Sequence, residues 1–460
     1  MRPVMRRVTM TAGRPLLALA LLFAVAQPAA AQSILRDSET EKLFNDMSRP
    51  LIEAAKLDPK NVKVVLINDP EINAFVATGQ TVYLHTGLIT ASDNANQVQG
   101  VIAHELGHVA GGHSIRIQDG AKQASGISIL SLVLGGLAMA AGAGEAAMGA
   151  MALGQQAAMG QFLAFTRAQE TSADLAGASY LGRAGISGQG SIDFFKKLQG
   201  QEYRLAVYST DSYNRTHPLS SERIASLTQV YQNDPAWKRR SDPALEARFQ
   251  RVRAKLIGYI SAKESVLRVY PATDTSIPAR YARAYAYHRM GDRDSALREA
   301  DALLATAPQD PFFLELKGQI LLESGKPSDA LTPLRDAVAR APDQPMIQAM
   351  LGHALLATEK PANFPEAEQV LKASIGRDAE QPFAWYQLGM IYDRKGDTAR
   401  AALATAERYS LEGEPKLALS SAELALRGIP QGTPDYIRAQ DIAMVSRTAV
   451  DKDKKRRRDK

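Results

Sequence analysis

The chain has 460 residues, 45% hydrophobic and 23% charged, and is long enough for two or three domains that each bury a substantial core. It has no cysteine, which excludes disulfides, thiolate metal ligands, a cysteine nucleophile and a lipoprotein anchor. The net charge of +6 arises at the two ends, where four arginines lie before residue 15 and the last ten residues carry seven basic and three acidic side chains. The body between them is slightly acidic, which argues against a nucleic-acid binder.

Residues 1–31 are predicted to be a cleaved signal peptide. Four arginines accompany the apolar run "PLLALALLFAVA", and three alanines follow it at residues 29–31. The run is shorter than the ~20 residues that a spanning helix needs, so a membrane anchor is the disfavoured alternative. We therefore expect an exported protein.

Residues 32–240 are predicted to form the first domain. Apolar residues recur at helical spacing from Ser33 to about Pro59. The runs "VKVVLIND", "INAFVATG" and "TVYLHTG" then predict a small antiparallel sheet, because they are short and rich in β-branched and aromatic residues. A helix is expected from about Ala95.

The sequence "HELGH" at residues 104–108 predicts a zinc site on that helix. His104 and His108 are four residues apart, so their imidazoles lie on one helix face and can share a zinc ion. Glu105 projects from the adjoining face towards the open coordination position, where it is the candidate general base.

The third zinc ligand is expected outside this motif. His113 misses by one residue the position of a third histidine in the pattern H-E-x-x-H-x-x-G-x-x-H, which is Ser114 here, so we interpret it as a structural histidine. The segment "FTRAQETSADLAGASYL" instead offers Glu170 as a ligand. Asp174 lies four residues later on the same face and can accept a hydrogen bond from a ligand histidine. A solvated surface helix is the alternative, which the apolar neighbours disfavour.

Residues 126–165 form an apolar block rich in glycine and alanine. Its most hydrophobic part, residues 127–143, is just at the lower length limit for a membrane span. A pair of packed helices or a mobile hairpin over the cleft is favoured. A hairpin that dips into a membrane and a true span stay open as alternatives.

Residues 241–278 are predicted to be a helical linker, and residues 279–446 a tetratricopeptide array with a capping helix. Its repeat glycines, Gly318, Gly352 and Gly389, follow one another at spacings of 34 and 37 residues, close to the period of such arrays. The insertion "PAN" in the third repeat should lengthen a turn. Arrays of this kind present a concave surface that binds partners.

Residues 447–460 contain the basic run "KKRRR" and are predicted to be a solvated, disordered tail. Attraction of this tail to anionic lipid is the minor alternative.

The motifs together resemble a known family. The segments "HELGH", "TRAQETSAD" and "RTHPLSSERI", preceded by "NAFVATG" and "TGLI", are similar to the zinc endopeptidases that include the CAAX prenyl endopeptidase and the protease HtpX. With a signal peptide and a repeat array, the chain most resembles their periplasmic branch, the β-barrel assembly-enhancing (BepA-like) proteases. The resemblance implies a mainly α (α+β) fold, in which a gluzincin-type metallopeptidase domain with a small antiparallel sheet precedes an α-solenoid.

The resemblance also supports particular site residues. It implies one Zn²⁺ per subunit bound by His104, His108 and Glu170, with Glu105 as general base and Asp174 behind a ligand. It draws attention to His217, which precedes Pro218 in a loop and can reach the open zinc position, either as a fourth ligand in a latent state or as a donor to the oxyanion. A purely structural role for His217 stays open. The weaker candidates for steering Glu105 or substrate are Arg167 and Arg223.

The expected function follows from this resemblance. We expect a periplasmic zinc endopeptidase that cleaves misfolded or stalled envelope proteins, with the array docking to the outer-membrane β-barrel assembly machinery or to substrates. The strand around "INAFVATG" is expected to be the sheet edge on which an extended substrate pairs. The alternatives are a largely latent protease that acts as a chaperone, and a membrane-embedded protease. Peripheral membrane contact also stays open.

Overall fold

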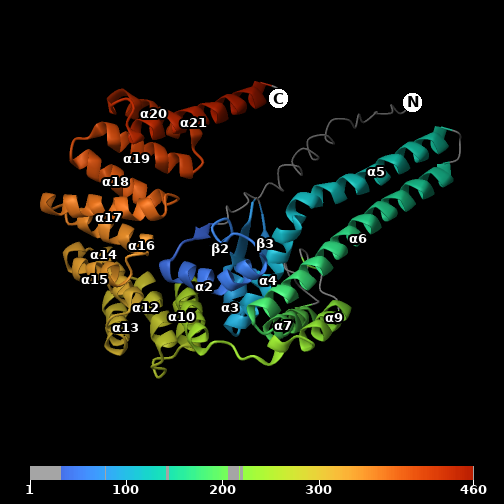
Figure 1. Ribbon diagram of the computed structural model, residues 1–460, viewed down its shortest axis with the longest axis horizontal. Helices are drawn as coiled ribbons and strands as arrows, with labels where there is room; N and C mark the ends of the chain where they lie inside the picture. Colours follow the sequence, from blue (N-terminus) through green and yellow to red (C-terminus); the bar gives the residue numbers. More distant parts are fainter. Residues whose placement is uncertain (1–32, 78, 141–143, 206–216, 218–220, 459–460) are drawn as a thin grey trace, which may run out of the picture.

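The computed structural model describes residues 33–77, 79–140, 144–205, 217 and 221–458. The predicted signal peptide lies outside these residues. The chain forms a mainly helical fold, in which a part with a small sheet is followed by a long row of helix pairs (Figure 1). The predicted fold class is confirmed.

The sheet has four strands in the order β1-β2-β4-β3, and these are β1 (Ile34–Leu35), β2 (Lys63–Ile67), β3 (Ala74–Val76) and β4 (Thr81–His85). Strand β2 runs parallel to β4, whereas β1 and β3 pair antiparallel with their neighbours. The sheet is therefore mixed, and the prediction of a purely antiparallel sheet is wrong. After β2 the chain passes to the outer strand β3 and returns as β4, which fills the space between them and so has the direction of β2. The expectation that "INAFVATG" forms a sheet edge is confirmed.

Helix α4 (Ala95–Gly111) lies at the centre of this part, and every residue from Ala95 to His108 is buried. The side chain of Asn94 caps its start, and the left-handed conformation of Gly112, with φ of 61°, ends it. The helices around the sheet and α4 are α2 (Ser38–Ala54), α3 (Thr86–Ala91), α6 (Gly144–Ala184), α7 (Gln189–Leu205) and α9 (Ser221–Gln232), followed by the short helix η1 (Pro235–Lys238).

The apolar block forms a pair of packed helices. Helix α5 (His113–Ala140) and the first half of α6 lie side by side and project from the body of the molecule rather than over it (Figure 1). In the part of the chain that the structure describes, no helix combines the length and the apolar character needed to cross a membrane.

Helix α10 (Pro243–Ile260) joins the two parts of the chain, followed by α11 (Lys263–Val269). The predicted linker is helical, and α10 also packs against both parts of the chain. Phe249, Val252 and Leu256 are buried in the same core as α2 and α4, while α10 also packs against the first helix of the array.

The array contains four helix pairs, namely α12 (Ile277–Arg289) with α13 (Arg293–Thr306), α14 (Pro311–Glu323) with α15 (Pro327–Arg340), α16 (Pro345–Ala357) with α17 (Phe364–Arg377), and α18 (Pro382–Arg394) with α19 (Thr398–Leu411). Gly318 and Gly352 allow close packing, because a Cβ on either would lie 2.4 or 2.5 Å from a leucine of the paired helix. The inserted "PAN" forms the extra helical turn η2 (Pro361–Asn363), as expected.

Helices α20 (Pro415–Gly428) and α21 (Pro434–Arg458) close the array. The tail prediction is wrong up to Arg458, because α21 continues through the basic run as one helix. Lysine and arginine have high helix propensity, so this run extends a helix that already exists instead of breaking it. The last two residues lie outside the described part.

The array curves back onto the first part of the chain. Arg36 lies 2.7 Å from Asp378, and Lys63 lies 2.6 Å from Glu380, in the loop between α17 and α18. A more buried contact joins α10 to the first part of the chain, where Lys255 lies 2.5 Å from Asp37 at the start of α2. A cavity of about 200 Å³ lies at this junction, lined among others by Ser38, Lys255, Tyr285, Glu315, Met346 and Met350.

Candidate metal centre

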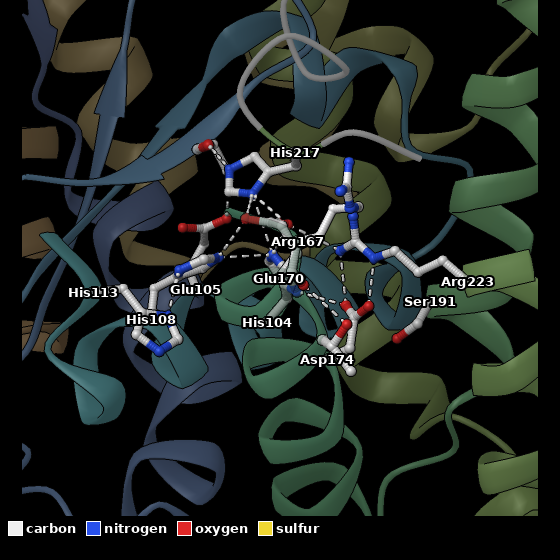
Figure 2. Close-up of polar contacts among 12 residues, drawn as sticks. His104, Glu105, His108, His113, Arg167, Glu170, Asp174, Ser191, His217 and Arg223 are labelled. Carbon is white, nitrogen blue, oxygen red and sulfur yellow. Dashed lines mark hydrogen bonds and ion pairs between the residues drawn. The ribbon is translucent and has the colours of Figure 1, made fainter. Parts of the chain in front are cut away.

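Four buried side chains converge beside α4. His104 and His108 come from α4, Glu170 from α6 and His217 from the segment before α9, and one nitrogen or oxygen atom of each lies within 4.8 Å of all the others (Figure 2). The two ring Nε2 atoms of His104 and His108 are 3.1 Å apart, and Glu170 Oε1 is 3.2 Å from His108 Nε2. These three predicted zinc ligands therefore meet at one point.

Helix packing explains how α6 brings its carboxylates to the histidines. A Cβ on Gly107 would lie 2.6 Å from the carbonyl oxygen of Ala173, and a Cβ on Gly177 would lie 3.0 Å from the backbone of Ala103. Only glycine at these positions allows the two helix backbones to cross so closely. Glu170 and Asp174, which flank Ala173, consequently reach the histidines of α4.

The hydrogen bonds behind the histidines aim their lone pairs at the same point. Nδ1 of His104 lies 2.8 Å from Oδ1 of Asp174, and a carboxylate can only accept, so the proton is on Nδ1 and the Nε2 lone pair faces the cluster. Nε2 of His217 likewise donates to the carbonyl oxygen of Ala74 at 3.2 Å, which leaves the Nδ1 lone pair directed inward. A metal cation is the partner that fits such a set of donors.

His113 lies behind His108 and outside the cluster. Its Nδ1 is 2.9 Å from Nδ1 of His108, and it opens α5 after Gly112 has ended α4. The sequence indicated a structural role for His113 but not its contact with His108. Burial and the neighbouring His108 lower the pKa of His113 to about 4, so it is neutral near pH 7.

Charge in the cluster is balanced by hydrogen bonding. Burial opposes ionisation of Glu170, but its hydrogen bonds to His104, His108 and His217 hold the pKa of this carboxyl far below its usual range. Burial also opposes the charged form of His104, yet Asp174 and Glu170 raise the pKa of its imidazole to about 10.

The surroundings of Glu105 are the strongest test of whether these residues fit a metal ion. It is fully buried, and among the described residues neither of its carboxylate oxygens has a hydrogen-bond partner. The nearest ionisable neighbour is His217, whose Nε2 lies 3.5 Å from Oε1. A buried carboxylate in this state is costly unless a further polar group completes the site. A hydrated metal ion among the four converging side chains meets this need.

The two arginine candidates differ in position. Arg223 of α9 lies 2.8 Å from Asp174 Oδ1 and 3.1 Å from Glu170 Oε2, so it holds these two carboxylates rather than Glu105 (Figure 2). Burial alone would raise the pKa of Asp174, but Arg223 and His104 lower it. Arg167 lies on α6 three residues before Glu170 and is exposed. Its role in steering stays a prediction.

One group of the site left no signal in the sequence. The carbonyl oxygen of Ala74 on the edge strand β3 receives the hydrogen bond of His217 and thus connects the strand to the cluster. Because it is a backbone atom, no residue pattern could have indicated it.

The comparisons with known proteins agree with this geometry. Residues 37–231 match the family described as Peptidase family M48. The chain is 24% identical over 435 residues to the β-barrel assembly-enhancing protease of Yersinia pestis, which covers 90% of this chain and 85% of that protein. It is 26% identical over 314 residues to the protein of that name from Escherichia coli K12, and this alignment covers 66% of this chain and 62% of that protein.

A solved structure is similar to part of the chain. The TPR protein YrrB, whose title mentions an unusual peptide-binding site, is 18% identical with a TM-score of 0.32, and the match covers 39% of this chain and 92% of that one. The family match, by contrast, includes all four converging side chains as well as Glu105 and Asp174. Residues 37–231 of this chain are therefore similar to Peptidase family M48, and this similarity covers the whole candidate metal centre.

Proposed function

We propose that the chain is a zinc-dependent endopeptidase of the periplasm, which cleaves misfolded or stalled envelope proteins. One observation carries the proposal, namely that the buried carboxylate of Glu105, which has no hydrogen-bond partner among the described residues, lies beside four converging metal-ligating side chains. All of these residues belong to the segment that matches Peptidase family M48. The name of the relatives in Yersinia pestis and Escherichia coli supports the setting of outer-membrane β-barrel assembly.

The donor set favours zinc. Two imidazoles and one carboxylate are a known catalytic ligand set for Zn²⁺, and the absence of cysteine leaves only nitrogen and oxygen donors. When bound there, zinc supplies an acidified water and polarises a peptide carbonyl. His104, His108 and Glu170 are the proposed ligands, and Asp174 keeps His104 in the tautomer that can bind.

Glu105 is the proposed general base. Its carboxylate is next to both ligand histidines and is free of competing hydrogen bonds in the described structure. It accepts the proton of the attacking water and then delivers it to the nitrogen of the leaving amine. No side chain needs to form a covalent intermediate.

The edge strand β3 is the proposed substrate platform. It packs against α4, and its outer side has no strand neighbour in the described sheet. An extended peptide that pairs there lies along the cluster, and main-chain pairing demands little of its side chains. Such a site accepts chain segments that are unfolded. The helix array is the proposed docking element for substrates or for the β-barrel assembly machinery.

A second candidate function is a largely latent protease that acts mainly as an assembly factor or chaperone. The position of His217 favours it, because its Nδ1 lies 3.3 Å from His104 Nε2 and 3.1 Å from Glu170 Oε2. A fourth protein ligand would close the coordination position that a catalytic zinc site keeps open. Its hydrogen bond to Ala74 also occupies the substrate platform.

The test uses an outer-membrane β-barrel protein in two states. The purified chain, loaded with zinc, is mixed with the barrel either unfolded in dilute urea or folded in detergent micelles. We expect cleavage of the unfolded form alone, and stronger cleavage when His217→Ala removes the closing ligand. The proposal fails if zinc-loaded protein with and without this substitution cleaves neither form.

A further inference from the structure

The hairpin of α5 and α6 leaves large apolar side chains in water. Each of them is at least 42% exposed, and they are Ile129, Leu130, Leu132, Val133 and Leu134 on α5, with Met148, Leu153, Met159 and Leu163 on α6. The hairpin projects away from the rest of the molecule (Figure 1). Among the residues that the structure describes, no element packs over these side chains.

The two helices pack through small residues. A Cβ on Gly154 would lie 1.9 Å from the Cβ of Ser131, and Ala158, four residues further along α6, is buried. At these positions small residues make the contact, and the nine large apolar side chains named above lie outside it. In water the large apolar residues belong between the helices. Small residues at the contact are the arrangement that helices use in lipid.

The exposed apolar surface covers more than half of the circumference of α5. At 100° per residue, the positions from Ile129 to Leu134 cover an arc of about 200° around α5, and Ser131 lies in the remaining sector. A protein groove covers one side of a helix. An apolar surface that covers more than half of the circumference of a helix is fully buried by a continuous apolar medium.

The charged side chains of the hairpin lie mainly at its base. Residues 123–166 contain one charged side chain, Glu145, whereas Arg116 and Lys122 lie on α5 before this stretch and Arg167 lies directly after it on α6. Arg116, Lys122 and Arg167 are all exposed, and Lys122 also faces Asp119 at 3.8 Å. Cations at the base of an apolar hairpin lie where lipid phosphates meet an inserted helix.

Length limits how deep such a hairpin reaches. The apolar part of α5, residues 126–140, is about 22 Å long at 1.5 Å per residue. This is more than half but less than the whole of a hydrocarbon core of about 30 Å. It agrees with the finding that none of the described helices is suited to crossing a membrane.

We propose that the α5–α6 hairpin inserts into a lipid bilayer from one side without spanning it. Insertion places the metal centre at the membrane surface, because α5 begins at His113 beside His108, and Glu170 lies one turn after the uncharged stretch of α6. The chain thereby meets polypeptides that are stalled at that surface. The inference concerns binding alone and stands or falls independently of proteolysis.

The experiment uses the absence of cysteine in the chain. Single cysteines replace Leu130, Leu153 or, as a control on α20, the similarly exposed Leu417. Each carries an environment-sensitive fluorophore and is mixed with vesicles of phosphatidylethanolamine and phosphatidylglycerol. We expect a blue shift, and quenching by lipids that carry a spin label in the acyl chain, at both hairpin positions and not at Leu417.

A charge-insertion pair makes the test quantitative. The double substitution Leu130→Glu with Val133→Glu should reduce flotation of the chain with vesicles by about tenfold or more, because each glutamate replaces an apolar side chain that would lie in the hydrocarbon of the bilayer. Leu417→Glu with Leu424→Glu, an equal change at exposed sites of α20, should leave it unchanged. Circular dichroism and urea unfolding confirm that both variants fold.

Three results would overturn the proposal. The unmodified chain fails to float with vesicles, the α20 control loses binding as much as the hairpin variant, or only one of Leu130 and Leu153 leaves water. The last result indicates a protein groove on one side of the hairpin. Loss of phosphatidylglycerol should weaken flotation while the blue shift of the bound fraction persists, since the headgroup contacts and the apolar insertion are separate.

Discussion

Asp174 holds His104 from behind, with 2.8 Å between its Oδ1 and the Nδ1 of the imidazole, and both side chains are more than nine-tenths buried. The pair joins α6 to α4 at the point where Gly107 lets the helices touch. It fixes which histidine nitrogen faces the cluster. The geometry of the metal centre thus depends on a residue that does not itself contact the metal position.

The substitution Asp174→Asn should weaken zinc binding by about 10- to 100-fold. An amide can still accept the proton of His104 Nδ1, but it lacks the negative charge that strengthens the ligand and that pairs with Arg223. Competition with a chromogenic chelator measures the affinity. Asp193→Asn, on an exposed position of α7, is the matched control. Equal affinities of both variants would contradict the role of Asp174.

The substitution Glu105→Gln should lower cleavage of an unfolded reporter by about 10² to 10⁴-fold while the bound zinc is retained. The amide has nearly the same shape but cannot accept a proton. Cleavage rate and metal content are measured on the same preparation. Zinc loss in parallel with activity would place Glu105 among the ligands, and unchanged activity would remove it from the mechanism.

The sequence predicted the local part of the site well. The four-residue spacing of His104 and His108 is a property of one helix, and the apolar surroundings of Glu170 indicated a buried carboxylate. The pairing of Arg223 with Asp174 joins elements 49 residues apart, and nothing in the local pattern indicates it. The expected proximity of His217 to the metal came from family resemblance and not from spacing.

The fold shows the same division between local and distant interactions. Strands, turns and repeat glycines follow from local pattern. The parallel pairing of β2 with β4 depends on which strand fills the centre of the sheet, and a run such as "VKVVLIND" is compatible with either direction. The projecting hairpin was equally undetermined, because apolar periodicity does not tell a helix buried in protein from one exposed for another medium.

The substitution His217→Ala should increase the cleavage rate several-fold if the resting state is latent. It opens the fourth coordination position and frees the carbonyl of Ala74 on the edge strand. His353→Ala in the array is the control, and kcat and KM are measured separately. A lower kcat with unchanged zinc content would instead assign His217 to stabilising the oxyanion. No change in either constant would leave it a structural residue.

The substitution Gly107→Ala should destabilise the domain by about 1 to 3 kcal/mol and weaken zinc binding, although it touches no ligand. The added methyl would lie 2.6 Å from the Ala173 carbonyl and force α4 and α6 apart. Gly200→Ala on α7 is the control, since a methyl there meets nothing within 4 Å. It should stabilise by a few tenths to about 1 kcal/mol. Urea unfolding of both variants distinguishes close packing from helix propensity.

Stability at the junction of the two parts should fall as the pH rises. Burial, together with the nearby Asp37 and Glu39, outweighs the attraction of Lys255 and raises the pKa of Glu315 to about 8. The folded chain therefore binds this proton more tightly than the unfolded chain, whose glutamate titrates near 4.5. The stabilisation is complete below pH 4.5 and is lost progressively up to about pH 8.

Glu315→Gln keeps the neutral form at every pH, so its unfolding free energy should be nearly flat across this window and exceed that of the parent at pH 8, by on the order of a few kcal/mol. Urea midpoints at pH 5 and pH 8 measure the difference, with the exposed Glu359→Gln as control. Parallel pH dependence of parent and Glu315→Gln would show that this carboxyl is not the group responsible.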